Sequence, residues 1–193
     1  MKFIQKISIV TISYFLVSCT TASSFNLNDY SKYRSKVGSA SEGLPPLTFF
    51  HDYQKMQFTY RLVTELFFES EGMALFIDYD ENNYVTASNE INERYEYITE
   101  PIGGKYIQFP VTEFTYGGYD FKISPQPHTT VEGKTYFDCK TFTMVGFDHD
   151  KYRIALLYYY DFDIDYLVED SASEKQKENT MPNLIKDNFF WRR

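Results

Sequence analysis

The sequence predicts a mainly β protein: a single antiparallel β domain built from successive hairpins, with at most one or two short helices. We expect a sandwich, a curved sheet or a half-barrel. Turn signals such as Glu81-Asn82-Asn83 and Gly117-Gly118 recur between aromatic and β-branched runs, which is typical of hairpins. Aromatic residues make up 19% of the chain, which argues for a packed core and against general disorder.

The longest strand pattern covers residues 152–168. Every even position from Tyr152 to Val168 is apolar, and a helix cannot hold a period of two over this length. The pattern predicts a strand with its even side chains in the core, while its odd positions mix charged residues with apolar ones. Because it exceeds the usual strand length of about 3–10 residues, we expect it to be bent, bulged or divided. Residues 56–68 also alternate, with polar residues on the other face, and predict a half-buried strand.

Helix signals are fewer. Ile91, Tyr95 and Ile98 have the spacing of one helix face, which predicts a short helix there. Residues 171–174 have capping-box spacing ahead of a polar stretch, which predicts a solvated helix that Pro182 would end. The apolar residues that follow, 184–191, are a candidate segment for docking on the domain.

The first nineteen residues have the pattern of an export signal. Lys2 and Lys6 precede an apolar run that is shorter than the roughly 20 residues of a membrane-spanning helix, which predicts a cleaved secretory signal peptide. The run closes with Leu-Val-Ser-Cys at 16–19, which resembles the lipobox of bacterial lipoproteins. The resemblance covers this segment only. It implies cleavage after residue 18, acylation of Cys19 and, with Thr20 rather than Asp next, the outer membrane of the bacterial envelope.

Four regions are expected on this basis. Residues 1–18 form the cleaved signal peptide, 19–46 a lipidated tether, 47–168 the β domain and 169–193 a polar C-terminal segment. The tether is inferred from the Ser, Thr and Asn content of the region and from its closing proline pair. The alternative is that this region packs as a first strand or short helix through Phe25, Leu27, Tyr30 and Tyr33.

The charge of the chain limits its partners. The formal net charge is −8, and removal of the two leader lysines leaves −10. Such a surface disfavours nucleic acid and anionic lipid headgroups. With Cys19 acylated, Cys139 is the remaining thiol, so the mature chain is not expected to form an internal disulfide.

Two groups of acidic residues are candidate sites. Asp161, Asp163 and Asp165 would lie on one strand face beside Tyr159, which makes them the candidate binding surface. Asp78, Asp80 and Asn82 match the first three positions of a calcium loop. That loop lacks the glycine and the bidentate glutamate it requires, so a hairpin turn is favoured there, and no metal or cofactor is expected.

Motifs for catalysis are missing from the sequence. It contains no complete nucleophile elbow and no glycine-rich phosphate loop, although a spatial pair of carboxylates remains open. The favoured hypothesis is a lipid-anchored, non-catalytic envelope lipoprotein whose β domain binds a protein or an envelope polymer. The alternatives are a carrier of lipid or small apolar ligands, an inhibitor or immunity-type lipoprotein that uses its acidity, and a hydrolase.

Overall fold

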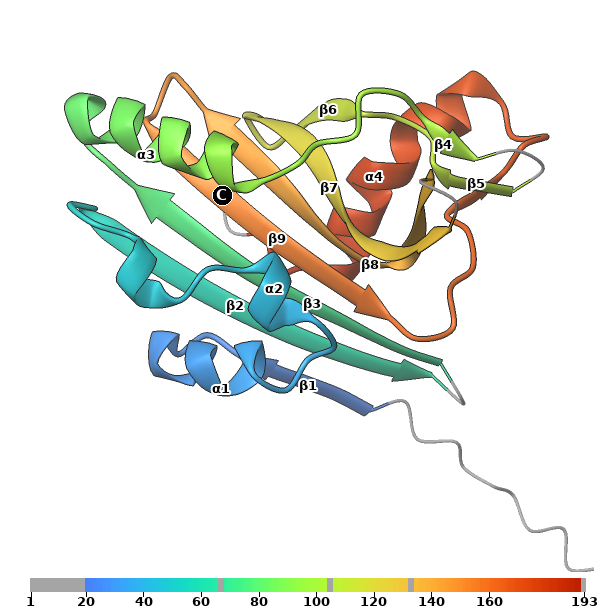
Figure 1. Cartoon of the computed structure of the whole chain (residues 1–193). Helices are drawn as coiled ribbons and strands as arrows, with labels where there is room; N and C mark the ends of the chain where they lie inside the picture. Colours follow the sequence, from blue (N-terminus) through green and yellow to red (C-terminus); the bar gives the residue numbers. More distant parts are fainter. Residues whose placement is uncertain (1–19, 66–67, 104–105, 132–133, 192–193) are drawn as a thin grey trace, which may run out of the picture.

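The computed structural model describes residues 20–65, 68–103, 106–131 and 134–191. Its main feature is a curved antiparallel sheet, and a small second sheet lies beside it (Figure 1). In spatial order the main sheet contains β1 (Thr20–Ser24), β2 (Lys55–Glu65), β3 (Phe68–Asp78), β9 (Arg153–Asp161), β8 (Lys134–Asp148), β7 (Tyr119–Val131) and β6 (Glu113–Tyr116). The small sheet contains β10 (Val168–Glu169), β5 (Tyr106–Phe109) and β4 (Ile102–Gly103). The prediction of a mainly β, antiparallel fold is confirmed.

Helices occupy more of the chain than the sequence patterns indicated. They are α1 (Tyr30–Arg34), α2 (Ala40–Gly43), α3 (Glu81–Arg94) and α4 (Glu174–Asn188), with 3-10 turns η1 (Leu27–Asp29) and η2 (Leu47–Phe49). The hairpin turn expected at 81–83 is instead the start of α3. The carboxylate of Asp80 accepts a hydrogen bond from the Asn83 backbone N–H at 2.9 Å and so caps the helix.

The C-terminal helix is amphipathic rather than solvated. Ser173 and Gln176 form the capping box, two positions later than the predicted one at 171–174, and Pro182 lies inside α4 instead of ending it. Met181, Leu184 and Ile185 lie on one helix face and are buried against the sheet. The expectation of a solvated helix was wrong because the apolar face lies in the second half of the helix, beyond its polar first turns.

Both faces of the main sheet are covered. The even side chains of β9, such as Leu156 and Tyr158, pack in a core with residues of α1, α2 and α3. The odd ones, such as Leu157 and Tyr159, pack in a second core with α4 and β5. The prediction of buried even side chains is confirmed for Ile154, Leu156 and Tyr158, and the odd face of β9, which ends at Asp161, is buried as well. Phe162 continues the even series but is 65% exposed, because the sheet does not extend that far.

The segment expected to be a tether is part of the folded domain. β1 pairs with β2 through all five of its residues, and Tyr30 and Leu44 are fully buried. Hydroxyl groups hold the segment in place: within it, Tyr30 donates to the carbonyl of Pro45 at 2.5 Å, and from outside it Tyr95 donates to that of Gly43 at 2.7 Å. Its few apolar residues are placed well enough to order it, as in the alternative of a first strand and short helices. None of the described helices is long and apolar enough to cross a membrane.

Candidate binding groove

The predicted acidic surface does not form a continuous stripe. Asp161 is buried, and its carboxylate accepts hydrogen bonds from the Ser70 hydroxyl at 2.6 Å, the Tyr159 hydroxyl at 3.0 Å and the Asp163 backbone N–H at 2.9 Å. These bonds secure the end of β9, where the chain leaves the sheet. Asp161 is therefore placed to hold structure together rather than to meet a partner.

The other members of the predicted surface separate. Tyr159 is only 3% exposed and belongs to the core under α4, where burial raises the pKa of its hydroxyl. Asp163 is exposed in the loop after β9, and Asp165 lies 3.6 Å from the Lys140 ammonium group. The expected common face was wrong because the strand ends before the second aspartate.

The residues of the calcium-loop pattern have structural positions instead of forming a loop around an ion. Asp78 pairs with Arg153 at 3.3 Å, Asp80 caps α3, and Asn82 is exposed in the first turn of that helix. Within the described residues, no group of three or more His, Cys, Asp or Glu side chains could hold a metal ion. Cys19, the predicted acylation site, lies outside the described residues.

An open groove lies where α4 ends, and sequence reasoning missed it. Its volume is about 470 Å³, within the usual range of ligand sites. The lining comes from β2, β6, α4 and the segments after β1 and α4. It consists of Phe25, Arg61, Tyr116, Lys186, Phe189, Phe190 and Trp191. Aromatic and cationic side chains from distant parts of the chain therefore meet at one place.

Two glycines allow the chain end to reach the sheet. A Cβ atom at Gly72 in β3 would lie 2.4 Å from the carbonyl oxygen of Asn188, so the missing side chain lets α4 end directly on the strand. Gly117 has a φ of +62°, and a Cβ there would lie 2.4 Å from the Trp191 ring. The turn between β6 and β7 therefore accommodates the indole only because residue 117 is glycine.

Trp191 is held by a cluster of rings. Its ring centroid lies 5.1 Å from that of Tyr116, 5.3 Å from that of Phe76 and 5.5 Å from that of Tyr119, in edge-to-face geometry. Burial raises the pKa of Tyr119 to about 12, although the nearby Arg153 opposes this shift. One wall of the groove is thus a rigid aromatic surface built on the sheet.

The rest of the lining combines rings with positive charge. Phe25, 45% exposed, packs on Phe190 with ring centroids 5.0 Å apart, and the Arg61 guanidinium lies 5.4 Å from the centroid of Phe190. Arg61 also donates to the backbone carbonyl of Asp187, which fixes its side chain. Lys186 lies in the last turn of α4, and no carboxylate belongs to the lining. In an acidic chain, the groove is a local site for negative charge.

A second unusual group, Glu71, lies on the other face of the sheet. Burial raises its pKa to about 7, the Glu69 carboxylate adds to this, and a hydrogen bond with Tyr60 opposes it. Its Oε2 atom is buried without a hydrogen-bond partner among the described residues. Tyr160 is its cross-strand neighbour, and Tyr33 of α1 stacks on Tyr60 at 3.8 Å. This carboxyl group is placed to change its charge near neutral pH.

No family model, curated protein or solved structure matches this chain. The signal that could have indicated the groove is the aromatic run Phe189-Phe190-Trp191 directly after Lys186. From the sequence, this run predicted only a docking segment. The sequence did not indicate that this run shares a groove with Phe25, Arg61 and Tyr116. Their proximity follows from the curvature of the sheet and the course of α4, which local patterns do not contain.

Proposed function

We propose that this chain is a lipid-anchored, non-catalytic envelope protein whose β domain binds an acidic segment of a partner protein in the aromatic groove. The observation that carries the proposal is the groove lining: aromatic rings and two cations without a carboxylate, in a chain of net charge −8. An anionic envelope polymer presents related chemistry and is the alternative partner class.

The chemistry of the lining suits protein recognition. Trp, Tyr and Arg dominate the energetically important positions of interfaces, because they bury a large area and keep a polar group available. Trp191 and Tyr116 supply rigid apolar surface, while Arg61 and Lys186 can pair with carboxylates. An apolar side chain beside a carboxylate would therefore be complementary to this groove.

The lipid anchor rests on the N-terminal sequence. The leader pattern and Leu-Val-Ser-Cys at 16–19 support acylation of Cys19. Several acyl chains on one residue hold a protein on a bilayer almost permanently, since each buried methylene contributes about 0.8 kcal/mol. Outer-membrane attachment is part of this proposal.

The other functional hypotheses have less support. A carrier would need space on the even face of β9, but Leu156 and Tyr158 are fully buried there among other side chains. An inhibitor that used its acidity would need the predicted stripe, which separates at Asp161. A hydrolase of the two-carboxylate type would need converging acids, and Asp161, Asp163 and Asp165 do not converge.

The test is photo-crosslinking in living cells. A photoreactive phenylalanine analogue replaces Phe25 in the groove or, as a matched control, Val85, which is 56% exposed on α3. We expect a discrete cross-linked protein from position 25 and not from position 85. Lys186→Glu in the same chain should reduce that product, because the mutation reverses an exposed charge of the groove without touching the core.

Two results would contradict the proposal. One is the same cross-linked species from both positions, which would indicate collision rather than binding. The other is a yield of cross-linked product from position 25 that Lys186→Glu does not change. A cross-linked product digested by glycan hydrolases instead of proteases would assign the groove to an envelope polymer.

A further inference from the structure

The first strand leaves no room for a tether. β1 is paired with β2 from its first residue, with Thr20 opposite Thr64. Cys19 is the next residue along the chain, and adjacent Cα atoms are about 3.8 Å apart. An acyl group on Cys19 would therefore be attached directly to the edge of the sheet. The domain could not stand away from the lipid surface as it would on a flexible linker.

One end of the sheet lies beside this attachment point. Figure 1 shows the start of β1, the end of β2, the start of β3 and the end of β9 at the same end of the molecule. Thr64 pairs with Glu69 of β3 as well as with Thr20 of β1, so Glu69 lies two strand spacings, about 10 Å, from Thr20. Ser70 pairs with Asp161, and Phe162 follows directly.

The same end exposes apolar surface. Phe162 is 65% exposed, the highest value among the large apolar side chains of the described residues. The Lys140 ammonium lies 5.6 Å from the centroid of the Phe162 ring. A ring beside an ammonium group is suited to the interface between lipid tails and headgroups, where the aromatic body is buried and the charge stays in water.

We propose that the anchored domain sits directly on the bilayer, with the sheet end that carries Thr20, Glu69 and Phe162 against the lipid. This inference rests on the proposed acylation of Cys19. It replaces the picture of a domain on a tether with one of a domain held in a limited range of orientations. Phe25 in the groove then lies within about 22 Å of the acylated residue, since an extended residue spans at most about 3.6 Å. The partner site would lie close to the membrane.

Charge sets which lipid surface this end prefers. Glu69 and Asp163 are exposed there, and Asp165 is beside Lys140. These carboxylates repel anionic headgroups, so contact should be closest on zwitterionic lipid, and salt should improve contact on anionic lipid.

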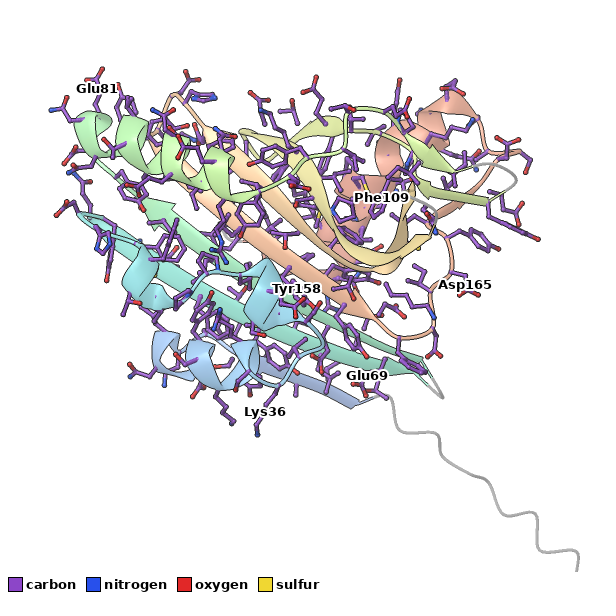
Figure 2. The ribbon with its side chains drawn as sticks, viewed as in Figure 1. Lys36, Glu69, Glu81, Phe109, Tyr158 and Asp165 are labelled. Atoms are coloured by element: carbon purple, nitrogen blue, oxygen red, sulfur yellow. The ribbon has the colours of Figure 1, made fainter. Side chains whose placement is uncertain are left out.

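The test uses the full acylated protein in phosphatidylcholine vesicles that contain a headgroup quencher. A fluorescent label is placed either at the sheet end beside the anchor or at the opposite end of the molecule. Glu69→Cys reports the anchor end and Glu81→Cys the far end; both glutamates are exposed, and Figure 2 shows them at opposite ends of the molecule. Cys139 is buried and the acyl group occupies Cys19, so the label reacts with the introduced thiol. We expect several-fold stronger quenching at 69 than at 81.

Three further variants separate direct contact with the lipid from chance approach. Phe162→Ser should reduce quenching at position 69, whereas Val85→Ser, on the exposed surface of α3, should not change it. A flexible Gly/Ser insertion between Cys19 and Thr20 should also reduce it, because the insertion creates the missing tether. Quenching at position 69 that is unchanged by both Phe162→Ser and the insertion would overturn the proposal.

The remaining outcomes distinguish the proposed lipid-anchored function from the proposed contact with the bilayer. Mass spectrometry of the N-terminal peptide shows whether Cys19 carries fatty acid. An unmodified Cys19 would refute the lipid-anchored function and the membrane contact that depends on it. An acylated Cys19 with equal, weak quenching at positions 69 and 81 would refute direct contact alone and leave the anchor in place.

Discussion

Replacing Glu71 by Gln is expected to stabilise the protein above neutral pH and to have little effect near about pH 4. The reason is the position of this carboxyl group, which lies partly buried beside Tyr60 and Tyr160 with one oxygen unpaired. Above its pKa of about 7, the folded protein must hold a negative charge where solvation is poor. Glutamine keeps the shape of the side chain and removes that charge.

The direction follows from proton binding. The pKa is about 7 in the folded chain and 4.5 for an unperturbed glutamate, so the folded state binds more protons between these values. The stability that Glu71 contributes to the folded state is fully present below about pH 4.5 and is lost as the pH rises through 7. A shift of this size corresponds to at most about 3 kcal/mol, and the partial exposure of Glu71 reduces this to about 1–2 kcal/mol.

The assay is urea unfolding of a soluble chain beginning at Thr20, followed by the emission of its single tryptophan at several pH values. The free energy of unfolding of the Gln variant should exceed that of the wild type by about 1–2 kcal/mol at pH 8, and the difference should disappear toward pH 4. Glu100→Gln, at an exposed loop position, is the control for loss of one negative charge. Parallel stability curves for wild type and Glu71→Gln across this pH range would refute the reasoning.

Three other substitutions test the geometry of the fold. Asp161→Asn should lower the free energy of unfolding by about 1–3 kcal/mol, because three donors lose an ionised acceptor, whereas Asp163→Asn should change it by less than about 0.5 kcal/mol. Equal losses in urea unfolding would contradict the buried role of the first aspartate. Gly117→Ala should cost about 1–3 kcal/mol and red-shift the emission of Trp191, because a positive φ and the indole both exclude a side chain. An unchanged spectrum and melting temperature would show that the turn adapts.

Local patterns were sufficient for the class of the fold. The period of two in residues 152–168 correctly indicated β9 up to Asp161, because strand geometry places successive side chains on opposite faces. The turn signal at Gly117-Gly118 also marks an observed connection, that between β6 and β7. Such features depend on neighbouring residues alone, so the sequence carries them directly.

The covering of the sheet was decided only by tertiary structure. Whether the odd side chains of β9 meet water or α4 depends on a helix that begins at Glu174, and the sequence of the strand does not contain that information. In the same way, Tyr30 and Leu44 convert an apparently polar tether into a packed segment because the sheet offers them a face to bury against. Burial of a few well-placed side chains outweighs the average composition of a segment.

The candidate sites in the structure differ from those predicted from the sequence for the same reason. Asp161, Asp163 and Asp165 are evenly spaced in sequence, but the chain leaves the sheet at the first of them, so they share no face. Phe25 and Trp191 are far apart in sequence and line the same groove because the residues after β1, strands β2 and β6, and the end of α4 come together there. The sequence by itself determined the residue types and the strand periodicity of this protein. Strand ends, sheet curvature and helix docking, which arise from long-range packing, decided which of those residues form a common surface.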